Sequence, residues 1–432
     1  MKVALTVAGS DSSGGAGIQT DVRAMASLGV HPCTVITCVT SQNTEDVDSI
    51  FSMPTEEIEK QLKAILRDIG VSAAKTGMLW SVEIARVVAE NLEKADLPLV
   101  VDPVMISTTN KPLQSEDLTD VLKSRLLPMS EVVTPNTWEA EVLSGVRIEN
   151  ENDVQSACER IHSLGARNVL IKGGHLEGEP VDILFSNGEF VRFRGERYKE
   201  DVHGSGCAFS AFITANLALG KDLVESIEKS KRMVTAGFFN SYKIGKGVPV
   251  VQSHYTVDRY SVWKELDLAL EHLKSILTTE LVPEVGINIG HALPFATDTD
   301  DIAGLEGRIV KVGDKVDTLA HIDFGASKHV AKIILTAMKY NHGSRSAMNL
   351  RFSDDLVEKC RSVGFSVAEF DRSEEPEHVS TMEWGTENAI LSHGSVPDVI
   401  FDRGSVGKEP MVRLLGESPS EVVEKLRTIL AR

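Results

Sequence analysis

Several short stretches of the sequence combine glycine with residues that can bind anions or do acid–base chemistry. In "HGSGC" (203–207), Gly204 and Gly206 flank a serine just before an apolar run that is typical of a helix. Backbone N–H groups at a helix N-terminus favour anions, and glycine lets a ligand approach closely. Cys207 stands at this helix end, where the helix dipole is expected to lower the pKa of its thiol. The pattern predicts a cradle for a phosphate or a developing oxyanion. The alternative is a small cysteine buried in a helix, which leaves the two glycines unexplained.

The N-terminal loop is also rich in glycine. In "AGSDSSGGAGIQTD" (8–21), Gly14, Gly15 and Gly17 separate a predicted strand from a predicted helix. The loop lacks the GK[ST] ending of a Walker A motif and does not fit GxGxxG, so it does not by itself predict a dinucleotide site. Asp21 lies about one helical turn after Gly17 and could face the same cavity. The alternative is a tight strand–helix turn followed by a solvated aspartate.

Two further stretches carry polar residues at predicted strand and helix ends. In "TPNTWEAE", Asn136 and Glu139 lie one turn apart at a helix start, so their oxygens can point the same way. Such oxygens suit a hydrated Mg²⁺ beside phosphates, although Asn136 would also serve as a plain N-cap. Lys172 of "LIKGGH" follows a predicted strand, and ligands collect at the carboxyl ends of parallel strands.

The first 245 residues alternate strand and helix patterns. Apolar or β-branched runs predict strands at 2–7, 33–40, 73–79, 97–105 and 168–171, and amphipathic stripes predict helices between them. "SNG" (186–188) between two short apolar runs predicts a hairpin. This βαβ repetition predicts a mainly parallel sheet with helices on both faces.

Periodicity is lost over 244–258, which predicts a boundary between a domain at 1–255 and a smaller α/β domain at 260–432. In the second domain we expect helices at 327–340, 354–363 and 418–431. Five polar stretches are read as strand ends: "HIDFGASKH" (321–329), "SRSAMNLRF" (344–352), "FDRSEEP" (370–376), "TMEWG" (381–385) and "FDRGSVGKEP" (401–410). Several cations lie in or near these stretches. Together they favour a phosphate site, whereas each alone is more often a surface residue: Lys332, Arg345, Arg351, Arg372, Arg403 and Lys408.

The overall composition narrows the class of protein. A formal charge of −18 on 432 residues argues against a nucleic-acid surface or a polybasic membrane contact, without excluding local phosphate pockets. The sequence has no run of about 18 apolar residues, so no membrane span is predicted. The five cysteines are scattered, which argues against a disulfide framework or a zinc site. We therefore expect the protein to be located in the reducing cytoplasm.

Residues 1–255 resemble hydroxymethylpyrimidine (phosphate) kinase of thiamine biosynthesis, a branch of the ribokinase-like superfamily. The resemblance rests on an ordered set of motifs: "AGSDSSGGAGIQTD", "SQNT", "KTGML", "DPVM", "TPNTWEA", "KGGH" and "HGSGC". It implies a mostly parallel sheet that binds ATP and substrate at the carboxyl ends of its strands. Two departures stand out. Val202 replaces a usual threonine, and "ISTTNKPL" (106–113) lacks a glycine common after DPVM.

The resemblance also implies residue roles. Gln42 would bind the aminopyrimidine, since its amide offers a donor and an acceptor. The pocket around the pyrimidine would be lined by Gly9, Asp21, Met78 and Val104. The ATP and Mg²⁺ side would hold Asn136, Glu139 and Lys172, with Glu139 facing the metal directly or through water. Cys207 takes the position of a catalytic aspartate of sugar kinases. As a thiolate it would accept the hydroxyl proton while the 204–207 amides, Mg²⁺ and Lys172 offset charge on the transferred phosphoryl group. The same site would then phosphorylate the monophosphate.

The second domain resembles the archaeal ThiN type of thiamine phosphate synthase through "HALPFA", "HIDFGAS", "SAMNLRF", "TMEWG" and "DVIFDRGSVGKEP". The implied reaction joins the pyrimidine diphosphate to a thiazole phosphate and releases pyrophosphate. Candidate phosphate-binding residues are Lys332, Arg345, Arg351 and Arg372, and candidate proton donors to the leaving group are His329 and His393.

Two alternatives remain at this point. Pyridoxal kinase shares the fold and a similar nucleophile, so a pyridoxine-type kinase competes with the first assignment. The second domain could instead sense thiamine phosphate without catalysis. In either case we expect small-molecule substrates, no nucleic-acid or membrane partner, and a homo-oligomer.

Overall fold

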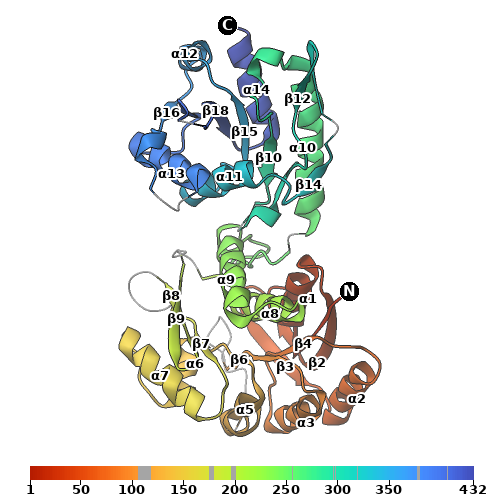
Figure 1. The fold of residues 1–432 in the computed structure, drawn as a ribbon. Coiled ribbons are helices and arrows are strands. Elements are labelled where there is room, and N and C mark those ends of the chain that lie inside the picture. The colour runs from red at the N-terminus through yellow and green to blue at the C-terminus, as the bar shows by residue number, and fades with distance from the viewer. Residues whose placement is uncertain are drawn as a thin grey trace. The chain divides into compact units, whose positions relative to one another are not determined.

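The computed structural model divides the chain into two compact units, Met1–Thr256 and Val257–Arg432 (Figure 1). It describes all residues except 106–117, 175–179, 196–200, 255, 295, 297, 319, 377–379 and 406, and only the backbone of 256–258. The loop 106–113 therefore lies outside the described residues.

The first unit is built on a nine-stranded sheet. Its strands are β1 (Val3–Asp11), β2 (His31–Gln42), β3 (Val47–Ser52), β4 (Ala73–Thr76), β5 (Leu99–Val101), β6 (Val132–Val133), β7 (Val169–Ile171), β8 (Val181–Ser186) and β9 (Glu189–Arg194). The order across the sheet is β3-β2-β1-β4-β5-β6-β7-β8-β9. The six strands from β2 to β7 in this order are parallel, whereas β3, β8 and β9 pair antiparallel at the edges.

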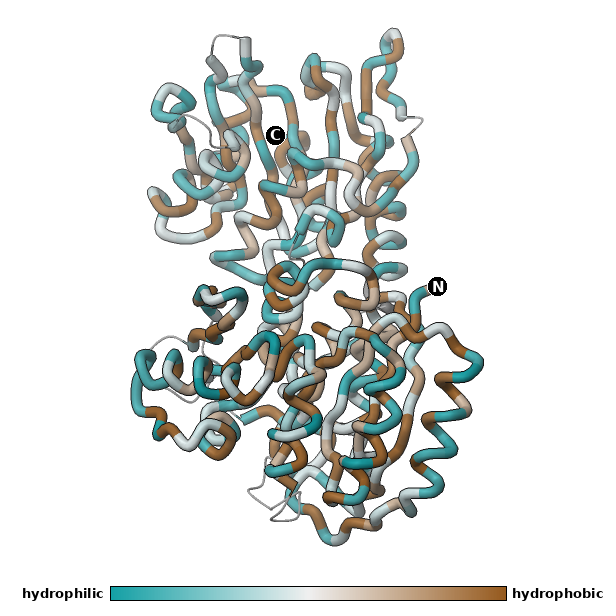
Figure 2. Tube along the Cα trace, turned by 60° about the horizontal axis from the view of Figure 1, so that its bottom comes forward, coloured by the Kyte–Doolittle hydropathy of each residue, from teal (hydrophilic) through white to brown (hydrophobic). Residues whose placement is uncertain are grey.

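Helices cover both faces of this sheet, as the βαβ pattern predicted. They are α1 (Gly17–Ser27), α2 (Thr55–Leu66), α3 (Val82–Leu92), α4 (Leu118–Val121), α5 (Leu127–Met129), α6 (Thr137–Ser144), α7 (Glu151–Ser163), α8 (Ser205–Ala218) and α9 (Leu223–Phe239). Leu5 and Val7 of β1 join the core beneath α2, α3, α6 and α7. The opposite face of the sheet packs against α1 and α8. Along the outer helices the tube alternates between hydrophobic and hydrophilic segments (Figure 2), as expected for helices with one buried face.

Two edge features of the first sheet have local explanations. The predicted hairpin forms between β8 and β9, and its turn residues Asn187 and Gly188 both have positive φ (51° and 82°), as a tight hairpin turn requires. Strand β3 was not predicted. Most of its residues are partly or fully exposed, so the strand lacks the buried apolar alternation on which the prediction of strands depends.

Residues 244–251 lie in the stretch where the sequence loses periodicity, and they belong to the first unit. Val250 pairs with both His203 and Tyr242, and the Val248 N–H donates to the carbonyl of Thr44. Val250 and Val251 are fully or almost fully buried. The segment therefore closes the first unit beside the "HGSGC" stretch.

The second unit contains a seven-stranded, mostly antiparallel sheet. Its strands are β10 (Ile289–Ala292), β11 (Ile302–Leu305), β14 (Ile322–Phe324), β15 (Ser346–Arg351), β16 (Val367–Glu369), β17 (Val399–Asp402) and β18 (Met411–Gly416), in the order β14-β11-β10-β15-β18-β17-β16. A separate small hairpin joins β12 (Val310–Val312) to β13 (Lys315–Asp317). Only the pair β16–β17 is parallel among the described strands of this sheet.

Helices also cover both faces of the second sheet. One core contains residues of α10 (Thr256–Ile276), α12 (Asp354–Ser362) and α14 (Pro419–Leu430), and the other contains residues of α11 (Lys328–Tyr340) and α13 (Thr381–His393). The predicted strand end "TMEWG" was wrong, because Thr381–Gly385 forms the first turn and a half of α13. Within the described residues, no helix is long and apolar enough to cross a membrane.

Candidate active site

The predicted anion cradle forms at the start of α8. Gly204 is its N-cap residue with φ of 83°, and no side chain caps the helix. A Cβ at Gly204 would lie 1.9 Å from the carbonyl oxygen of Gly15, so "HGSGC" packs directly on the N-terminal glycine loop. Only glycine satisfies both the positive φ and this close approach. The helix N-terminus consequently keeps backbone amides for a ligand.

Lys172 brings a positive charge to this cradle. A Cβ at Gly206 would lie 3.5 Å from Lys172 Nζ, which places the ammonium beside the first turn of α8. Lys172 Nζ also lies 3.3 Å from Asp102 Oδ1, and Asp102 Oδ2 accepts a 3.0 Å hydrogen bond from Ser210 Oγ of α8. Asp102 is 2% exposed. The buried carboxylate thus fixes both the lysine and the helix.

Glu139 and Asn136 form a capping box at the start of α6. The Glu139 N–H donates to Asn136 Oδ1, and the Asn136 N–H donates to Glu139 Oε2, both at 2.8 Å. Burial raises the pKa of Glu139 to about 7; Lys172 opposes the rise and Asp102 adds to it. These interactions place Glu139 in the same buried charge cluster as Asp102 and Lys172, although part of its carboxylate serves the helix cap.

Cys207 does not have the lowered pKa that its helix position predicted. Although the residue keeps some exposed surface, desolvation raises the pKa of its thiol to about 12. Lys75 lowers this pKa, while Asp21 and Asp102 raise it. The dipole of one helix end is worth about 0.3–1 kcal/mol near the surface, which is too small to overcome this desolvation. Cys207 is a thiol at neutral pH in the free protein.

Asp21 does not face the ligand pocket as expected. Its side chain has no exposed surface, and Lys75 Nζ lies 2.7 Å from Asp21 Oδ1. Thr6 Oγ1 donates to the other carboxylate oxygen at 2.6 Å. Burial alone would lower the pKa of Lys75, but Asp21, Cys207 and Asp102 raise it. Asp21 therefore holds a buried, charged lysine near Cys207 and does not contact solvent.

Gln42 lies next to His203 of the cradle stretch. Gln42 Nε2 is 3.1 Å from His203 Nε2, which in turn is 3.0 Å from Asp11 Oδ2. Thr40 Oγ1 lies 3.2 Å from Gln42 Oε1. His203 also fills the space above Gly15, where a Cβ would lie 2.3 Å from its ring. The amide of Gln42 is thereby positioned by groups from both glycine-containing stretches.

Three of the predicted pyrimidine-pocket residues come together. Cys38 and Met78 form a small apolar cluster against which Val104 packs. A Cβ at Gly9 would lie 2.8 Å from Cys38 Sγ and 3.3 Å from Met78 Sδ. Gly9, Met78 and Val104 therefore form one apolar wall, and Asp21 is the member of the predicted set that is absent from it.

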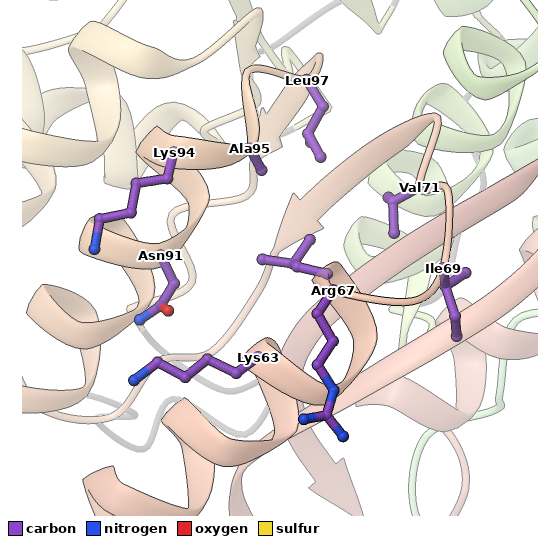
Figure 3. Close-up of a pocket in the computed structure, with 9 residues that line it drawn as sticks. Lys63, Arg67, Ile69, Val71, Asn91, Lys94, Ala95 and Leu97 are labelled. Carbon is purple, nitrogen blue, oxygen red and sulfur yellow. The ribbon is translucent and has the colours of Figure 1, made fainter.

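A separate hollow lies near the amino ends of the central strands β4 and β5. Figure 3 shows Lys63, Arg67 and Lys94 around a pocket of about 690 Å³. Val71 and Leu97, which also line it, precede β4 and β5, whereas Asp102 and Lys172 follow parallel strands. The pocket is thus at the amino ends of the strands, away from the cradle, and we assign it no part in the site.

In the second unit, the candidate cations do not form one group. Arg345 precedes β15 and Arg351 ends it, so a six-residue strand of about 20 Å separates them. Arg345 also donates to the carbonyl of Ala292 at 2.8 and 3.1 Å. Both arginines stay candidates for binding phosphate, but their separation means that they would contact different groups.

The two candidate histidines are also apart. His393 is exposed and is the last residue of α13. Lys332, which lies three residues after His329, instead contacts Glu383 in the first turn of α13 at 3.5 Å. His329 lies near Lys332 in α11. Burial lowers the pKa of His329, and Arg308 and Lys332 lower it further. Only His329 therefore lies in a cationic environment suited to phosphates.

Arg372 lies in a different, buried cluster. Its guanidinium contacts both oxygens of Asp402, with Nε 2.6 Å from Oδ1. Arg413 Nη2 lies 2.9 Å from Asp402 Oδ2. Asp402 ends β17 and Arg413 lies within β18, so two neighbouring strands build the cluster.

The family pattern of phosphomethylpyrimidine kinase matches residues 11–252, more than half of the chain. The chain belongs to the phosphomethylpyrimidine kinase family. A second pattern, that of thiamine-phosphate synthase ThiN, matches residues 265–428. We call the two units the kinase unit and the ThiN unit.

Relatives match the chain in whole or in part. The chain is 38% identical, over 99% of its length and 98% of the relative's, to the bifunctional thiamine biosynthesis protein ThiDN of Methanocaldococcus jannaschii. It is 44% identical over 246 residues to the bifunctional protein ThiED of Geobacter sulfurreducens, of which it covers half. The crystal structure of an ADP complex of Bacillus subtilis pyridoxal kinase superposes with a TM-score of 0.56 at 35% identity, over 60% of this chain and 98% of that one. The kinase unit thus has a ribokinase-like fold.

Sequence reasoning missed several residues that the site depends on. Asp102 lies in the quoted "DPVM" motif and Lys75 in "KTGML", yet neither received a role. In the kinase unit the signal was available, because a charged residue at the end of a buried strand is rarely placed there without a partner. Arg413 of the ThiN unit was hidden within the apolar strand "PMVRLLG".

Proposed function

We propose that the chain catalyses successive steps of thiamine biosynthesis. The kinase unit phosphorylates 4-amino-5-hydroxymethyl-2-methylpyrimidine and then its monophosphate with ATP. The ThiN unit couples the resulting diphosphate to thiazole phosphate and releases pyrophosphate. The observation that supports the kinase step most directly is the α8 cradle, where backbone amides, Lys172 and buried Asp102 meet at the carboxyl ends of parallel strands.

The kinase step depends mainly on positioning and electrostatics. Gln42 orients the pyrimidine ring against the wall of Gly9, Met78 and Val104. The hydroxymethyl oxygen then attacks the γ-phosphate in line. The amides of Gly204 and Gly206 at the start of α8 stabilise charge on the transferred phosphoryl group.

On the nucleotide side, Lys172 supplies a fixed positive charge. Desolvation alone would lower its pKa, but Asp102 and Glu139 raise it, so the lysine stays protonated at neutral pH. Asp102 therefore contributes indirectly, by holding the ammonium beside the cradle.

The carboxylates fit a loosely held Mg²⁺. Among the described residues there is no group of three or more His, Cys, Asp or Glu side chains that could hold a metal. Mg²⁺ in nucleotide enzymes needs only one or two carboxylates, with water and phosphates as its other ligands. We propose that Glu139, with Asn136 and Asp102 nearby, faces this ion directly or through water. When bound, the ion would neutralise charge on the nucleotide phosphates.

We propose a revised role for Cys207. A thiol with a pKa of about 12 carries its proton at neutral pH and cannot accept another. In a loose phosphoryl-transfer transition state the nucleophile retains its proton until late. The departing proton can then pass to the phosphoryl oxygens, while Cys207 serves as a small polar wall beside the reacting oxygen.

In the ThiN unit, pyrophosphate departure leaves a cation on the pyrimidine methylene that the thiazole nitrogen captures. The unit must therefore bind the leaving group and a second phosphate. We propose that Arg372, Lys332 and His329 take part, since Arg372 is buried against Asp402 and His329 lies among cations. Arg345 and Arg351 lie at opposite ends of one strand and would contact different groups.

Product analysis tests the whole proposal. The full chain is incubated with the hydroxymethylpyrimidine, thiazole phosphate, ATP and Mg²⁺. We expect the monophosphate first, then the diphosphate, then thiamine phosphate with pyrophosphate. The likeness to a pyridoxal kinase makes pyridoxal the matched competitor substrate. Faster consumption of ATP with pyridoxal than with the pyrimidine would contradict the kinase assignment.

The synthase step needs its own assay. Preformed diphosphate and thiazole phosphate are supplied to the full chain without ATP. Thiamine phosphate is the expected product. If no product forms while thiamine phosphate still binds, the ThiN unit is a sensor and the synthase assignment is wrong.

A further inference from the structure

The cluster of Arg372, Asp402 and Arg413 lies on one face of the second sheet. Ile400 and Leu415 pack in the core against α11 and α13. Asp402 and Arg413 each lie two residues from these along their own strands, so they point to the same face. The cluster is therefore located beneath the two helices that also carry His329, Lys332 and Glu383.

The three charged side chains are almost completely buried. Their exposures are 6% for Arg372, 0% for Asp402 and 2% for Arg413. Asp402 is bound on every side: both guanidiniums contact it, and Oδ1 also accepts the Gly404 N–H at 2.8 Å. It has no capacity left to neutralise a second positive charge.

The cluster and its surroundings carry an excess of positive charge. Glu375 lies near enough to Arg372 for that arginine to lower its pKa, and it pairs with Lys408 Nζ at 2.9 Å. Counting these two with the cluster gives three cations against two carboxylates. Burial of an incompletely paired charge is costly, and one more anion would remove the excess.

Arg413 also has hydrogen-bonding capacity to spare. Among the described residues, its buried Nη1 finds no hydrogen-bond partner. Its Nη2 lies 3.9 Å from Met382 Sδ in the first turn of α13, and its guanidinium lies 5.2 Å from the Phe370 ring centre. Natural proteins rarely leave a buried donor unpaired without a ligand or a functional reason.

We propose that Arg372 and Arg413 form a binding subsite for a phosphoryl group in the ThiN unit, with Asp402 holding both guanidiniums in place. Guanidinium groups match phosphate oxygens with paired donors, and a phosphoryl group would supply the missing negative charge. The inference rests on the proposed synthase function, in which a diphosphate and a monophosphate must both be bound. Either could occupy the subsite, and the experiment below separates them.

Calorimetric titration of the full chain with inorganic pyrophosphate tests the subsite. Saturating Mg·ADP occupies the kinase unit so that its cradle does not contribute. We expect saturable binding that Arg372→Met and Arg413→Met each weaken by at least about tenfold. Arg427→Met is the matched control, because Arg427 is exposed and pairs with Glu424 within α14 instead. Its affinity for pyrophosphate should match that of the unsubstituted chain.

Synthase kinetics then identify the occupant. A rise in KM for the pyrimidine diphosphate alone assigns the subsite to the leaving group, and a rise for thiazole phosphate alone assigns it to the second substrate. Kinase activity of the same chain should be unchanged. If no thiamine phosphate forms but pyrophosphate binding still depends on both arginines, the synthase proposal fails and the subsite stands.

Two results would overturn the subsite. One is pyrophosphate affinity and synthase KM values that are unchanged in both methionine variants. The second result comes from lysine variants, which are used if the methionine variants unfold. Arg372→Lys and Arg413→Lys keep the charge but lose the paired donors, so they should fold and still bind more weakly. Unchanged affinity in both lysine variants would show that the cluster is only structural.

Discussion

Lys75 Nζ lies 2.7 Å from Asp21 Oδ1, and neither side chain has any exposed surface. The pair joins α1, which follows the first glycine loop, to the parallel strand β4. It also brings a positive charge close enough to Cys207 to lower the pKa of that thiol. A buried ion pair therefore connects the fold of the loop to the electrostatics of the site.

Breaking this pair should destabilise the kinase unit strongly. Lys75→Met leaves Asp21 buried without its partner, which typically costs about 3–5 kcal/mol of unfolding free energy. Urea unfolding of the full chain, followed by a probe of the kinase unit, measures the loss. Lys60→Met is the control, because Lys60 pairs with Glu57 at the surface and its loss should not move the transition. Unfolding at an unchanged urea concentration for Lys75→Met would contradict the assignment.

Alanine at Gly204 should strongly reduce kinase turnover. The new Cβ would meet the Gly15 carbonyl oxygen at 1.9 Å, which forces the two glycine stretches apart. Gly220 is a matched control just beyond the other end of α8, with φ of 88° against 83° and no atom within 4 Å of the Cβ that alanine would add. Both variants pay about 1 kcal/mol for positive φ, but only Gly204→Ala should lose at least about a hundredfold in kcat. Equal losses in kcat for the two variants would show that the clash is unimportant.

Cys207 should be unreactive at physiological pH. Because its pKa is raised to about 12, the thiolate needed for alkylation is scarce below pH 10. The other four cysteines are buried. Iodoacetamide labelling at pH 7.5, followed by mass spectrometry, should find Cys207 essentially unmodified after conditions that label a free peptide thiol. Rapid labelling at that pH would restore the thiolate base.

A second measurement separates the two roles of Cys207. Cys207→Ser keeps a small polar wall but cannot form an anion at this pH. If Cys207 is a wall, the serine variant should retain kcat within about tenfold, whereas Cys207→Ala loses more. Pyrimidine binding should survive in both. A serine variant as inactive as the alanine variant would favour the base.

Glu139 should make stability depend on pH. Its pKa is raised from 4.5 to about 7, so between these values the folded chain holds a proton that the unfolded chain has lost. The free energy of unfolding should therefore contain a contribution that is present at low pH and decreases as the pH rises from 4.5 to 7. Glu139→Gln keeps the capping geometry and removes this contribution. Urea unfolding of both proteins at pH 5 and pH 8 measures the difference. Equal pH dependence in the two proteins would contradict the shift.

The kinase fold was predictable because its signals are local. Buried parallel strands are continuous apolar runs. An N-cap residue indicates where a helix begins, as Ser81 does for α3, where its side chain accepts a hydrogen bond from the Ile84 N–H. Strand β3 escaped because an exposed edge strand needs no apolar alternation. "TMEWG" was misread because polar residues at a helix start resemble those at a strand end.

The candidate site was predictable in its location but not in its energetics. Glycines and polar residues at strand ends predicted a shared site for Gly206 and Lys172, and the structure places the two side by side, while anion binding there stays a prediction. The pKa of Cys207 was predicted in the wrong direction, because it is raised by desolvation in the folded chain and by the charges of residues distant in sequence, such as Asp102. The same limit applies to Arg413, whose partner Asp402 is visible only once β17 and β18 are paired.

The pairing of Val250 with His203 determines where the chain can be divided. A kinase fragment that stops at residue 245 would lose the segment that supports His203, and through it the contact to Gln42. A fragment that extends past Val251 keeps both. Gene fusions and fissions that exchange the domain joined to this kinase can therefore place the junction only downstream of Val251. Residues 244–251 are then inherited together with the kinase unit.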